Sequence, residues 1–338
     1  MLLKNERSIR LGLLLGSGLV TLLVIELFLR LISYNYTPLR IQVQYQTDWR
    51  DYHIFEDNNF VYDPDLIWRP KEGASVFNSQ GYRGRELSLD KEPGAVRIFA
   101  VGDSNTLGWN TSDGANWPLS LDQLLHETDN RFTVINAGVW GYSSFQGLRR
   151  FQQTLPFQPD LVFISFGGND PHFVTISDSD FINRRSGIFA FYLQRALNKL
   201  KVGQFILELG DKFFLQHEQR LIHRVSLSEY EANLEEIIRL AEIRNIRVVL
   251  LTRPFIGASP DPLWWKNFAP AYNAATIEIA QRYHIPVIDI YTYFENKAEY
   301  FQDESHFNKA GHQVAAQIIY EHIEPLLTQL QPELRSAQ

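Results

Sequence analysis

The sequence predicts an α/β domain with a parallel β-sheet that helices cover on both faces, preceded by one N-terminal transmembrane helix. Three observations predict this organisation. From residue 96 onward, short apolar segments of strand length alternate with segments of helical periodicity, a pattern typical of βαβ units. Polar motifs follow the ends of three predicted strands, where the binding residues of parallel sheets collect. Near the N-terminus, an apolar segment is long enough to cross a membrane.

The predicted strands are apolar segments of five or six residues. They span Val96–Val101, Phe132–Asn136, Leu161–Phe166, Arg247–Thr252 and Pro286–Ile290. The predicted helices lie between and after them, at about residues 117–127, 143–155, 228–244, 267–283 and 308–330. We therefore expect one domain over residues 96–330, followed by a short tail at 331–338.

The composition limits the classes of partner. The 338-residue chain has a formal net charge of −7, so its overall field does not favour nucleic acid as a partner. A hydrophobic content of 45% is enough for a packed core. There is no cysteine, which excludes disulfides, thiolate zinc sites and a cysteine nucleophile.

Residues 1–33 are predicted to form a membrane anchor. Residues 11–25 carry no charge, and the apolar character continues through Ile32, which approaches the roughly 20 residues that cross a bilayer as a helix. Glu26 and Arg30 interrupt this segment, but their spacing of four places them on one helix face, where they can pair. Three basic residues precede the segment: Lys4, Arg7 and Arg10. The positive-inside rule then places the N-terminus in the cytoplasm and the remaining chain outside, on the periplasmic side.

Two other interpretations of the apolar segment are open. A cleaved signal peptide would need a small-x-small cleavage site, and none follows the segment. A buried core helix is the second alternative. We favour the uncleaved anchor.

Residues 34–95 form a lead-in rich in aromatic and turn residues. This composition predicts ordered loops that pack on another surface, rather than a flexible linker. Within the lead-in, the run from Asn78 to Arg83 contains Gly81 and Tyr82. We prefer a structural role with local pairing for Arg83 to a contact with substrate.

An insertion at about residues 171–227 interrupts the alternation of strands and helices. From Pro171 to Ser226 it carries eight basic and five acidic residues, a balance of +3 in a chain of −7. Amphipathic stretches lie near Ile188–Leu200 and Phe205–Leu215. The insertion forms either a lid or a surface that rests on anionic lipid headgroups, or else an ordinary helical insertion with solvated basic faces.

Four short motifs in the domain carry groups that can do chemistry. They are, in chain order, Gly102-Asp103-Ser104, Asn136-Ala137-Gly138 with Gly141 after it, Gly167-Gly168-Asn169-Asp170, and Asp303-Glu304-Ser305-His306. Each is weak alone. Together they provide a hydroxyl nucleophile, donors for an oxyanion, and an imidazole with a carboxylate to orient it, which is the set that acyl transfer requires.

The order and spacing of these motifs resemble the SGNH/GDSL hydrolase family. The resemblance covers roughly residues 96–330 and implies a three-layer α/β/α sandwich of the flavodoxin-like type, with no metal and no organic cofactor. It implies a triad of Ser104, Asp303 and His306, with Gly141 and Asn169 as oxyanion donors.

The other residues of the motifs are given lesser roles. Gly138 is the alternative to Gly141 and is otherwise a turn glycine. The resemblance implies a structural role for Asp103. We expect His312 to lie on a helix surface and assign no role to His172.

We therefore predict a single-pass, outward-facing serine hydrolase of acyl esters that forms an acyl-enzyme. Its substrate would be an acylated small molecule, lipid or glycan, including the hypothesis of O-acetyl groups on envelope glycans or exopolysaccharide. Trp109 and Trp140 lie within a few residues of the motifs, and Trp264 and Trp265 follow a turn after a predicted strand. Each of the four can stack on a sugar ring or simply fill the domain. The alternatives are an acyl transferase that acts on a polysaccharide and a non-catalytic envelope assembly or binding module.

Overall fold

The computed structural model describes residues 2–35, 58–111, 115–174, 176–184, 199–214, 221–262 and 264–335. Its helices are α1 (Leu2–Leu31), α3 (Ser104–Leu107), α4 (Trp117–Thr128), α5 (Ser144–Thr154), α6 (Asp178–Arg184), α8 (Lys201–Phe214), α9 (Leu227–Glu242), α10 (Ala269–Tyr283), α11 (Ile290–Phe294) and α12 (Lys309–Arg335). Its strands are β1 (Phe60–Asp63), β2 (Ile67–Pro70), β3 (Val96–Gly102), β4 (Phe132–Asn136), β5 (Leu161–Ser165), β6 (Phe173–Val174), β7 (Ile222–His223), β8 (Arg247–Leu251) and β9 (Val287–Ile288).

Five parallel strands form the central sheet in the order β4-β3-β5-β8-β9. If the five are numbered along the chain, this is the order 2-1-3-4-5 of flavodoxin-like folds. The chain leaves β3 toward β4 on one side and then crosses to β5 on the other side. Ligands of such sheets bind where the connections diverge, outside the carboxyl ends of these two strands. The predicted parallel sheet is confirmed, and its topology locates the site.

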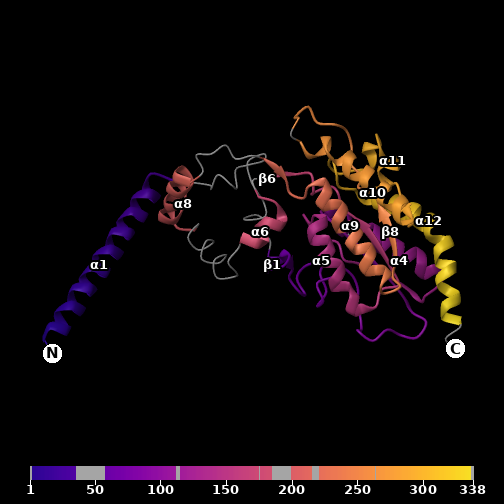
Figure 1. Ribbon diagram of the computed structural model, residues 1–338, viewed down its shortest axis with the longest axis horizontal. Helices are drawn as coiled ribbons and strands as arrows, with labels where there is room; N and C mark the ends of the chain where they lie inside the picture. The colour runs from indigo at the N-terminus through magenta and orange to yellow at the C-terminus, as the bar shows by residue number, and fades with distance from the viewer. Residues whose placement is uncertain are drawn as a thin grey trace.

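Helices cover both faces of the sheet, which gives the predicted three layers (Figure 1). Alternate residues of β3 point to opposite faces, as strand geometry requires. Phe99 and Val101 pack into one hydrophobic cluster with α5, α9 and α10. Ile98 and Ala100 pack into a second cluster with α4 and α12. All seven residues of β3 are buried, as expected for a strand that is covered on both sides.

The described part of the lead-in, residues 58–95, contributes buried side chains to the hydrophobic core. β1 and β2 form an antiparallel hairpin, and Trp68 is fully buried in the same cluster as α5 and α9. The Tyr142 hydroxyl donates to the Trp68 carbonyl at 2.7 Å. The Arg83 N–H donates to the Asn136 carbonyl at 2.9 Å, so the lead-in also covers part of the β4 edge. The domain boundaries themselves stay predictions.

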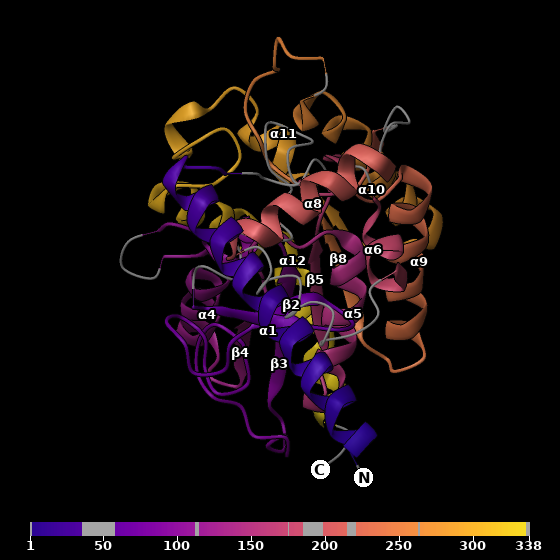
Figure 2. The ribbon, with the colours of Figure 1, turned by 90° about the vertical axis from the view of Figure 1, so that its left-hand side faces the viewer.

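α1 contains the apolar segment. Gly12–Leu31, 20 residues, is long and apolar enough to span a membrane, a property that a signal sequence would share. The predicted pairing within this helix is present, because Arg30 Nε lies 2.7 Å from Glu26 Oε1. α8 lies beside the C-terminal turns of α1, away from the sheet (Figures 1 and 2).

Two element predictions need correction. The last strand is only Val287–Ile288, because the Asp289 side chain accepts the Thr292 N–H and begins α11 at Ile290. The last helix continues to Arg335, beyond the predicted end at 330.

In the insertion, the stretch near Phe205–Leu215 corresponds to α8, whereas residues 188–198 of the other stretch lie outside the described residues.

Candidate active site

Ser104 stands at the turn between β3 and α3. The Asp103 side chain caps α3 by accepting the Asn105 N–H at 2.8 Å. A Cβ on Gly102 would lie 2.2 Å from the Thr106 hydroxyl and 2.9 Å from the Ser165 carbonyl, so only glycine allows this close turn. The turn places Ser104 at the carboxyl end of β3, at the first residue of α3.

The Arg83 side chain supports the other end of α3. Its Nη1 donates to the Leu107 carbonyl at 2.6 Å and to the Gly108 carbonyl at 3.1 Å. A cation at the C-terminal end of a helix satisfies carbonyls that have no partner within the helix. Arg83 therefore pairs locally, in agreement with the structural role that we preferred.

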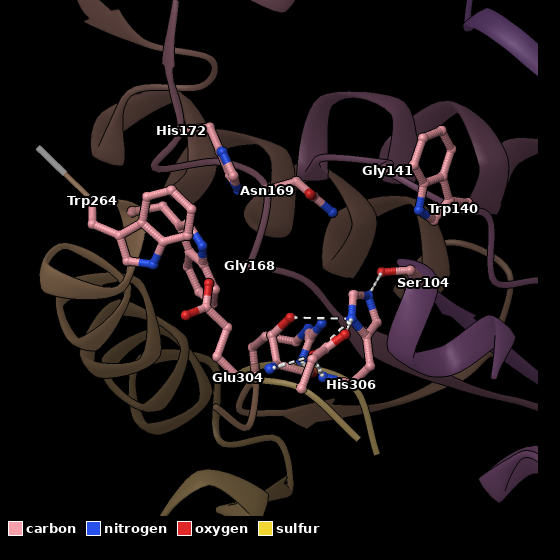
Figure 3. Close-up of a pocket in the computed structure, with 13 residues that line it drawn as sticks. Ser104, Trp140, Gly141, Gly168, Asn169, His172, Trp264, Glu304 and His306 are labelled. Atoms are coloured by element: carbon pink, nitrogen blue, oxygen red, sulfur yellow. Dashed lines mark hydrogen bonds and ion pairs between the residues drawn. The ribbon is translucent and has the colours of Figure 1, made fainter. Parts of the chain in front are cut away.

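His306 faces Ser104 from a loop that precedes α12. Ser104 Oγ lies 2.8 Å from His306 Nε2, and His306 Nδ1 lies 2.8 Å from Asp303 Oδ2. Asp303 Oδ1 also accepts the backbone N–H groups of Ser305 and His306, each at 2.8 Å. These bonds fold the loop tightly around the carboxylate. Hydroxyl, imidazole and carboxylate thus form one continuous chain (Figure 3).

A bridge across the base of this loop and contacts with the first turn of α12 hold the loop in place. Phe301 and Phe307 form an antiparallel bridge across it. The Asn308 side chain accepts the Gly311 N–H at 3.0 Å in the first turn of α12. A Cβ on Gly311 would lie 2.2 Å from the Tyr300 carbonyl, so the absence of a side chain allows α12 to begin directly against the loop.

The ionisation of Asp303 determines the direction of these hydrogen bonds. Burial alone would raise its pKa, but hydrogen bonds from His306 and from backbone N–H groups outweigh burial and lower the pKa to about 2. An ionised carboxylate can only accept. His306 Nδ1 therefore carries the proton, and Nε2 is left to accept from the Ser104 hydroxyl.

Asn169 and Gly141 line the same pocket as Ser104. Asn169 follows β5, and its Nδ2 donates to the Tyr142 carbonyl at 3.0 Å, which fixes the orientation of the amide. Gly141 follows β4 and has a φ of 73°, a conformation that favours glycine.

The Gly138 N–H donates to Asn136 Oδ1 at 2.9 Å, and a Cβ there would lie 2.4 Å from the Leu107 nitrogen. Gly138 is thus a packed turn glycine whose N–H already has an acceptor within the turn.

Asp170 shapes the turn that carries Asn169. Its carboxyl group is fully buried and accepts the Ser144 N–H at 2.8 Å and the Gly167 N–H at 3.1 Å. Burial raises the pKa of Asp170 to about 6, although these hydrogen bonds oppose the shift.

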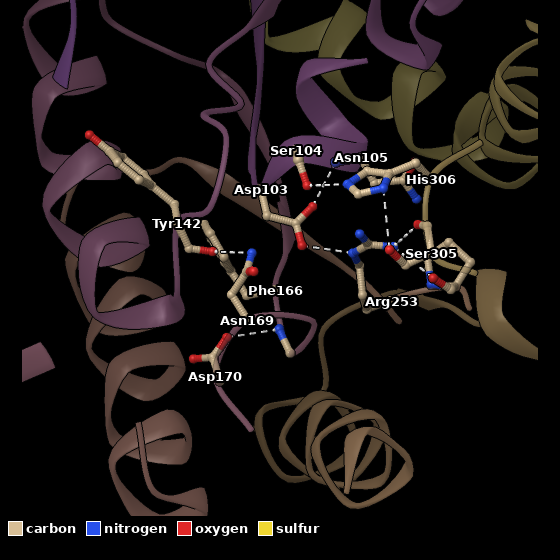
Figure 4. Close-up of polar contacts among 12 residues, drawn as sticks. Asp103, Ser104, Asn105, Tyr142, Phe166, Asn169, Asp170, Arg253, Ser305 and His306 are labelled. Atoms are coloured by element: carbon tan, nitrogen blue, oxygen red, sulfur yellow. Dashed lines mark hydrogen bonds and ion pairs between the residues drawn. The ribbon is translucent and has the colours of Figure 1, made fainter. Parts of the chain in front are cut away.

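Two buried arginines that were not predicted connect the motifs. Arg253, two residues after β8, donates from Nε to Asp103 Oδ2 at 2.7 Å and from Nη1 to the Ser305 carbonyl at 2.7 Å (Figure 4). Arg224 donates to the Gly141 carbonyl at 2.9 Å and pairs with Asp178 at 2.7 Å. The only sequence signal for Arg253 was its position after a strand, and Arg224 had no signal because it lies in the insertion.

The expectation for His312 was wrong. Its side chain is only 1% exposed, and its Nδ1 accepts the Trp117 N–H at 3.2 Å. Burial lowers its pKa to about 3. His172, to which we assigned no role, stacks on Trp265 with ring centroids 5.6 Å apart and lines the pocket.

The pocket has a volume of about 410 Å³. Trp140 and Trp264 lie on opposite sides of it in Figure 3, with Ser104 and His306 near Trp140. All five residues of the predicted site line it. Within the described residues, no group of three or more His, Asp or Glu side chains is placed to hold a metal ion.

The chain matches the GDSL-like lipase/acylhydrolase family over residues 100–314. An arylesterase of Vibrio mimicus is 36% identical over 75 residues, which is 22% of this chain and 38% of that protein. Esterase TesA of Pseudomonas aeruginosa is 36% identical over 85 residues, which is 24% of this chain and 41% of that protein. The matched stretches span about two fifths of the length of these curated relatives.

Solved structures are similar over a longer part of the chain. A lipase/acylhydrolase from Enterococcus faecalis is 21% identical, with a TM-score of 0.46, over 68% of this chain and 96% of that one. An acetylxylan esterase from Geobacillus stearothermophilus is 18% identical, with a TM-score of 0.47, over 69% of this chain and 96% of that one. Because the family match extends over more than half of the chain and contains all five residues of the predicted site, the chain belongs to the GDSL-like lipase/acylhydrolase family.

Proposed function

We propose that the protein hydrolyses carboxylic esters through an acyl-serine intermediate. Ser104 is the nucleophile, His306 the general base and then the general acid, and Asp303 the group that orients the imidazole. The observation that carries the proposal is the continuous chain from Ser104 Oγ through His306 to Asp303, with distances of 2.8 Å at both hydrogen bonds.

The mechanism follows from this chain. As Ser104 Oγ attacks the ester carbonyl carbon, its proton passes to His306 Nε2, and Asp303 stabilises the imidazolium. The backbone N–H groups of Ser104 and Gly141 and the Asn169 amide donate to the developing oxyanion. The tetrahedral intermediate collapses and the alcohol leaves with the proton from His306. Water, deprotonated by His306, then attacks the acyl-serine. The Oγ–acyl bond breaks, the acid is released, and His306 returns the proton to Ser104 Oγ.

The first test compares wild type with Ser104→Ala in the full-length protein. The variant should lose turnover of a short-chain p-nitrophenyl ester by a factor on the order of 10⁴ or more, and it should not form an adduct with a serine-directed phosphonate. The matched control is Ser120→Ala, on α4 and not among the pocket residues. An adduct of the same mass on Ser104→Ala would assign the nucleophile to another residue and exclude this mechanism. Folded wild-type protein without an adduct would also exclude it and favour a binding module.

For the substrate we propose O-acetyl groups on a glycan outside the membrane. The pocket is lined by Trp140, Trp264 and Trp265 beside Ser104, and tryptophan presents a large, rigid apolar face on which a sugar ring can stack. The proposed anchor at residues 1–33, with the N-terminus in the cytoplasm, would bring this pocket to envelope glycans. Transfer of the acyl group to a sugar hydroxyl uses the same acyl-enzyme, and analysis of the products with a glycan acceptor separates it from hydrolysis.

Trp264→Ala tests the glycan proposal. The ratio of kcat/KM for an acetylated oligosaccharide to kcat/KM for p-nitrophenyl acetate should fall about tenfold, which corresponds to roughly 1.4 kcal/mol of lost binding to the larger substrate. An unchanged ratio would contradict stacking on Trp264. If the wild-type protein hydrolyses acyl-lipids but no acetyl esters, the substrate proposal is wrong while the triad stands.

A further inference from the structure

The contacts between α1 and α8 fix the position of α8 relative to the apolar segment. Glu26 Oε2 accepts the Val202 N–H in the first turn of α8 at 2.8 Å. Lys201 Nζ lies 3.1 Å from Asn35 Oδ1, and the Tyr34 hydroxyl donates to Glu208. The two acceptors Glu26 and Asn35 lie on either side of Leu31, the last residue of the apolar segment. α8 is therefore held at the end of that segment.

The depth of this contact matches that of an interfacial helix. Gly12–Leu31 has 20 residues, which at 1.5 Å per residue is about 30 Å, the thickness of the hydrocarbon core. Glu26 lies five residues before Leu31, or about 7.5 Å from the end of the segment. Amphipathic helices that lie on a membrane are buried about 5–10 Å into the boundary between headgroups and acyl chains.

Apolar side chains of α8 are left exposed. Phe205, Ile206 and Leu209 have the spacing of one helix face, and Leu200 immediately precedes the helix. Between 38% and 54% of each of these four side chains is exposed. Lys199 is exposed two residues before α8, where a long basic side chain can reach lipid headgroups.

We propose that α8 is a second membrane contact, lying in the outer interface of the bilayer with Phe205, Ile206 and Leu209 among the lipids. This inference rests on the proposed anchor. It gives the Glu26 carboxylate in the apolar segment a second partner besides Arg30, because Glu26 accepts the first-turn N–H of α8 at the depth where α8 enters the interface. The sheet domain would then be attached to the membrane at two points of the chain, one before and one within the domain.

The absence of native cysteine allows a direct test with single-cysteine variants of the full-length protein. Ile206→Cys, Leu19→Cys and Ile243→Cys are labelled with bimane and reconstituted into phosphatidylcholine vesicles, with or without brominated phosphatidylcholine. Ile243, on the sheet domain after α9, is 63% exposed and has the same side chain as Ile206, which is 54% exposed; it is the matched control. Leu19 lies within the apolar segment and reports the anchor.

We expect brominated lipid to reduce the emission at positions 206 and 19 and to leave position 243 unchanged. If brominated lipid quenches the label at position 19 but leaves the emission at position 206 unchanged, as at position 243, then α8 faces water and the inference is overturned. Blue-shifted but unquenched emission at 206 would indicate a protein partner on this face, which also overturns it. Unquenched emission at 19 would refute the anchor itself, and the inference would fail with it.

Discussion

At the scale of single residues, the pocket combines groups that arrive from separate strands. Ser104 follows β3, Gly141 follows β4 and Asn169 follows β5. Each is fixed by a contact outside the triad: Asp103 caps the helix of Ser104, Arg224 holds the Gly141 carbonyl, and the Tyr142 carbonyl holds the Asn169 amide. Donors that are held in place before the reaction require little reorganisation when negative charge develops on the oxyanion.

Asn169→Ala tests this preorganisation. In the proposed mechanism the amide donates to an oxyanion that forms only on the way to the tetrahedral intermediate, so kcat should fall about 10²–10³-fold while KM changes little. Steady-state kinetics with a p-nitrophenyl ester measures both constants, and the thermal midpoint confirms that the variant is folded. A rise in KM with an unchanged kcat would instead assign Asn169 to binding of the substrate ground state.

At the scale of elements, Arg253 holds the β3–α3 turn and the loop before α12 together. It bonds to Asp103 on one side and to the Ser305 carbonyl on the other. Both charged side chains are almost fully buried, with 3% and 1% of their area exposed. Removal of one member of a buried pair leaves the other charge without compensation, so the geometry of Ser104 and His306 depends on an ion pair that neither of them makes.

A double-mutant cycle tests the pair. Arg253→Met should lower the free energy of unfolding by about 3–5 kcal/mol, because Asp103 remains as a buried, unpaired charge. Combining it with Asp103→Asn, whose amide oxygen can still cap α3, should cost less than the sum of the single changes, with a coupling of roughly 1–3 kcal/mol. Urea denaturation of the three variants measures the cycle. Additive effects would show that the pair does not contribute as a unit.

At the scale of the whole molecule, burial determines how the fold responds to acid. His312 links α12 to α4, because its side chain accepts the Trp117 N–H at the start of α4. An unfolded histidine binds a proton below a pKa of about 6.5, whereas burial lowers the pKa of His312 to about 3 in the folded chain. Its contribution to stability is therefore complete above pH 6.5 and is lost as the pH falls from 6.5 toward 3.

His312→Asn should make stability less dependent on pH. Asparagine still provides an acceptor for the Trp117 N–H but does not titrate, so the decline in unfolding free energy between pH 6.5 and 4 should be shallower by up to about 1.4 kcal/mol per pH unit. Asp170, with a raised pKa of about 6, acts in the opposite direction in both proteins and cancels in the comparison. His126→Asn, at an exposed position of α4, is the control. An equal flattening in both variants would contradict the role of burial.

The sequence by itself determined the α/β class, the approximate bounds of most elements and a chemically complete set of site residues. Apolar periodicity specifies which local segments are strands or helices, and the strand order then brings Ser104, Gly141 and Asn169 to one edge. The roles of the five site residues stay predictions, although the structure places all of them in one pocket. The short β9 and the α11 that follows it were mistaken for one strand because the capping by Asp289 outweighed the apolar pattern.

Only the tertiary structure decided which residues support that set. Arg253 lies 150 residues after Asp103, and Arg224 lies 83 residues after Gly141, so no local pattern relates them. His312 was assigned to a helix surface because helical periodicity does not reveal that a neighbouring helix covers that face. The contact between Glu26 and α8 likewise joins segments that are 176 residues apart. Local pattern specifies secondary structure, whereas long-range packing determines which buried polar groups find partners.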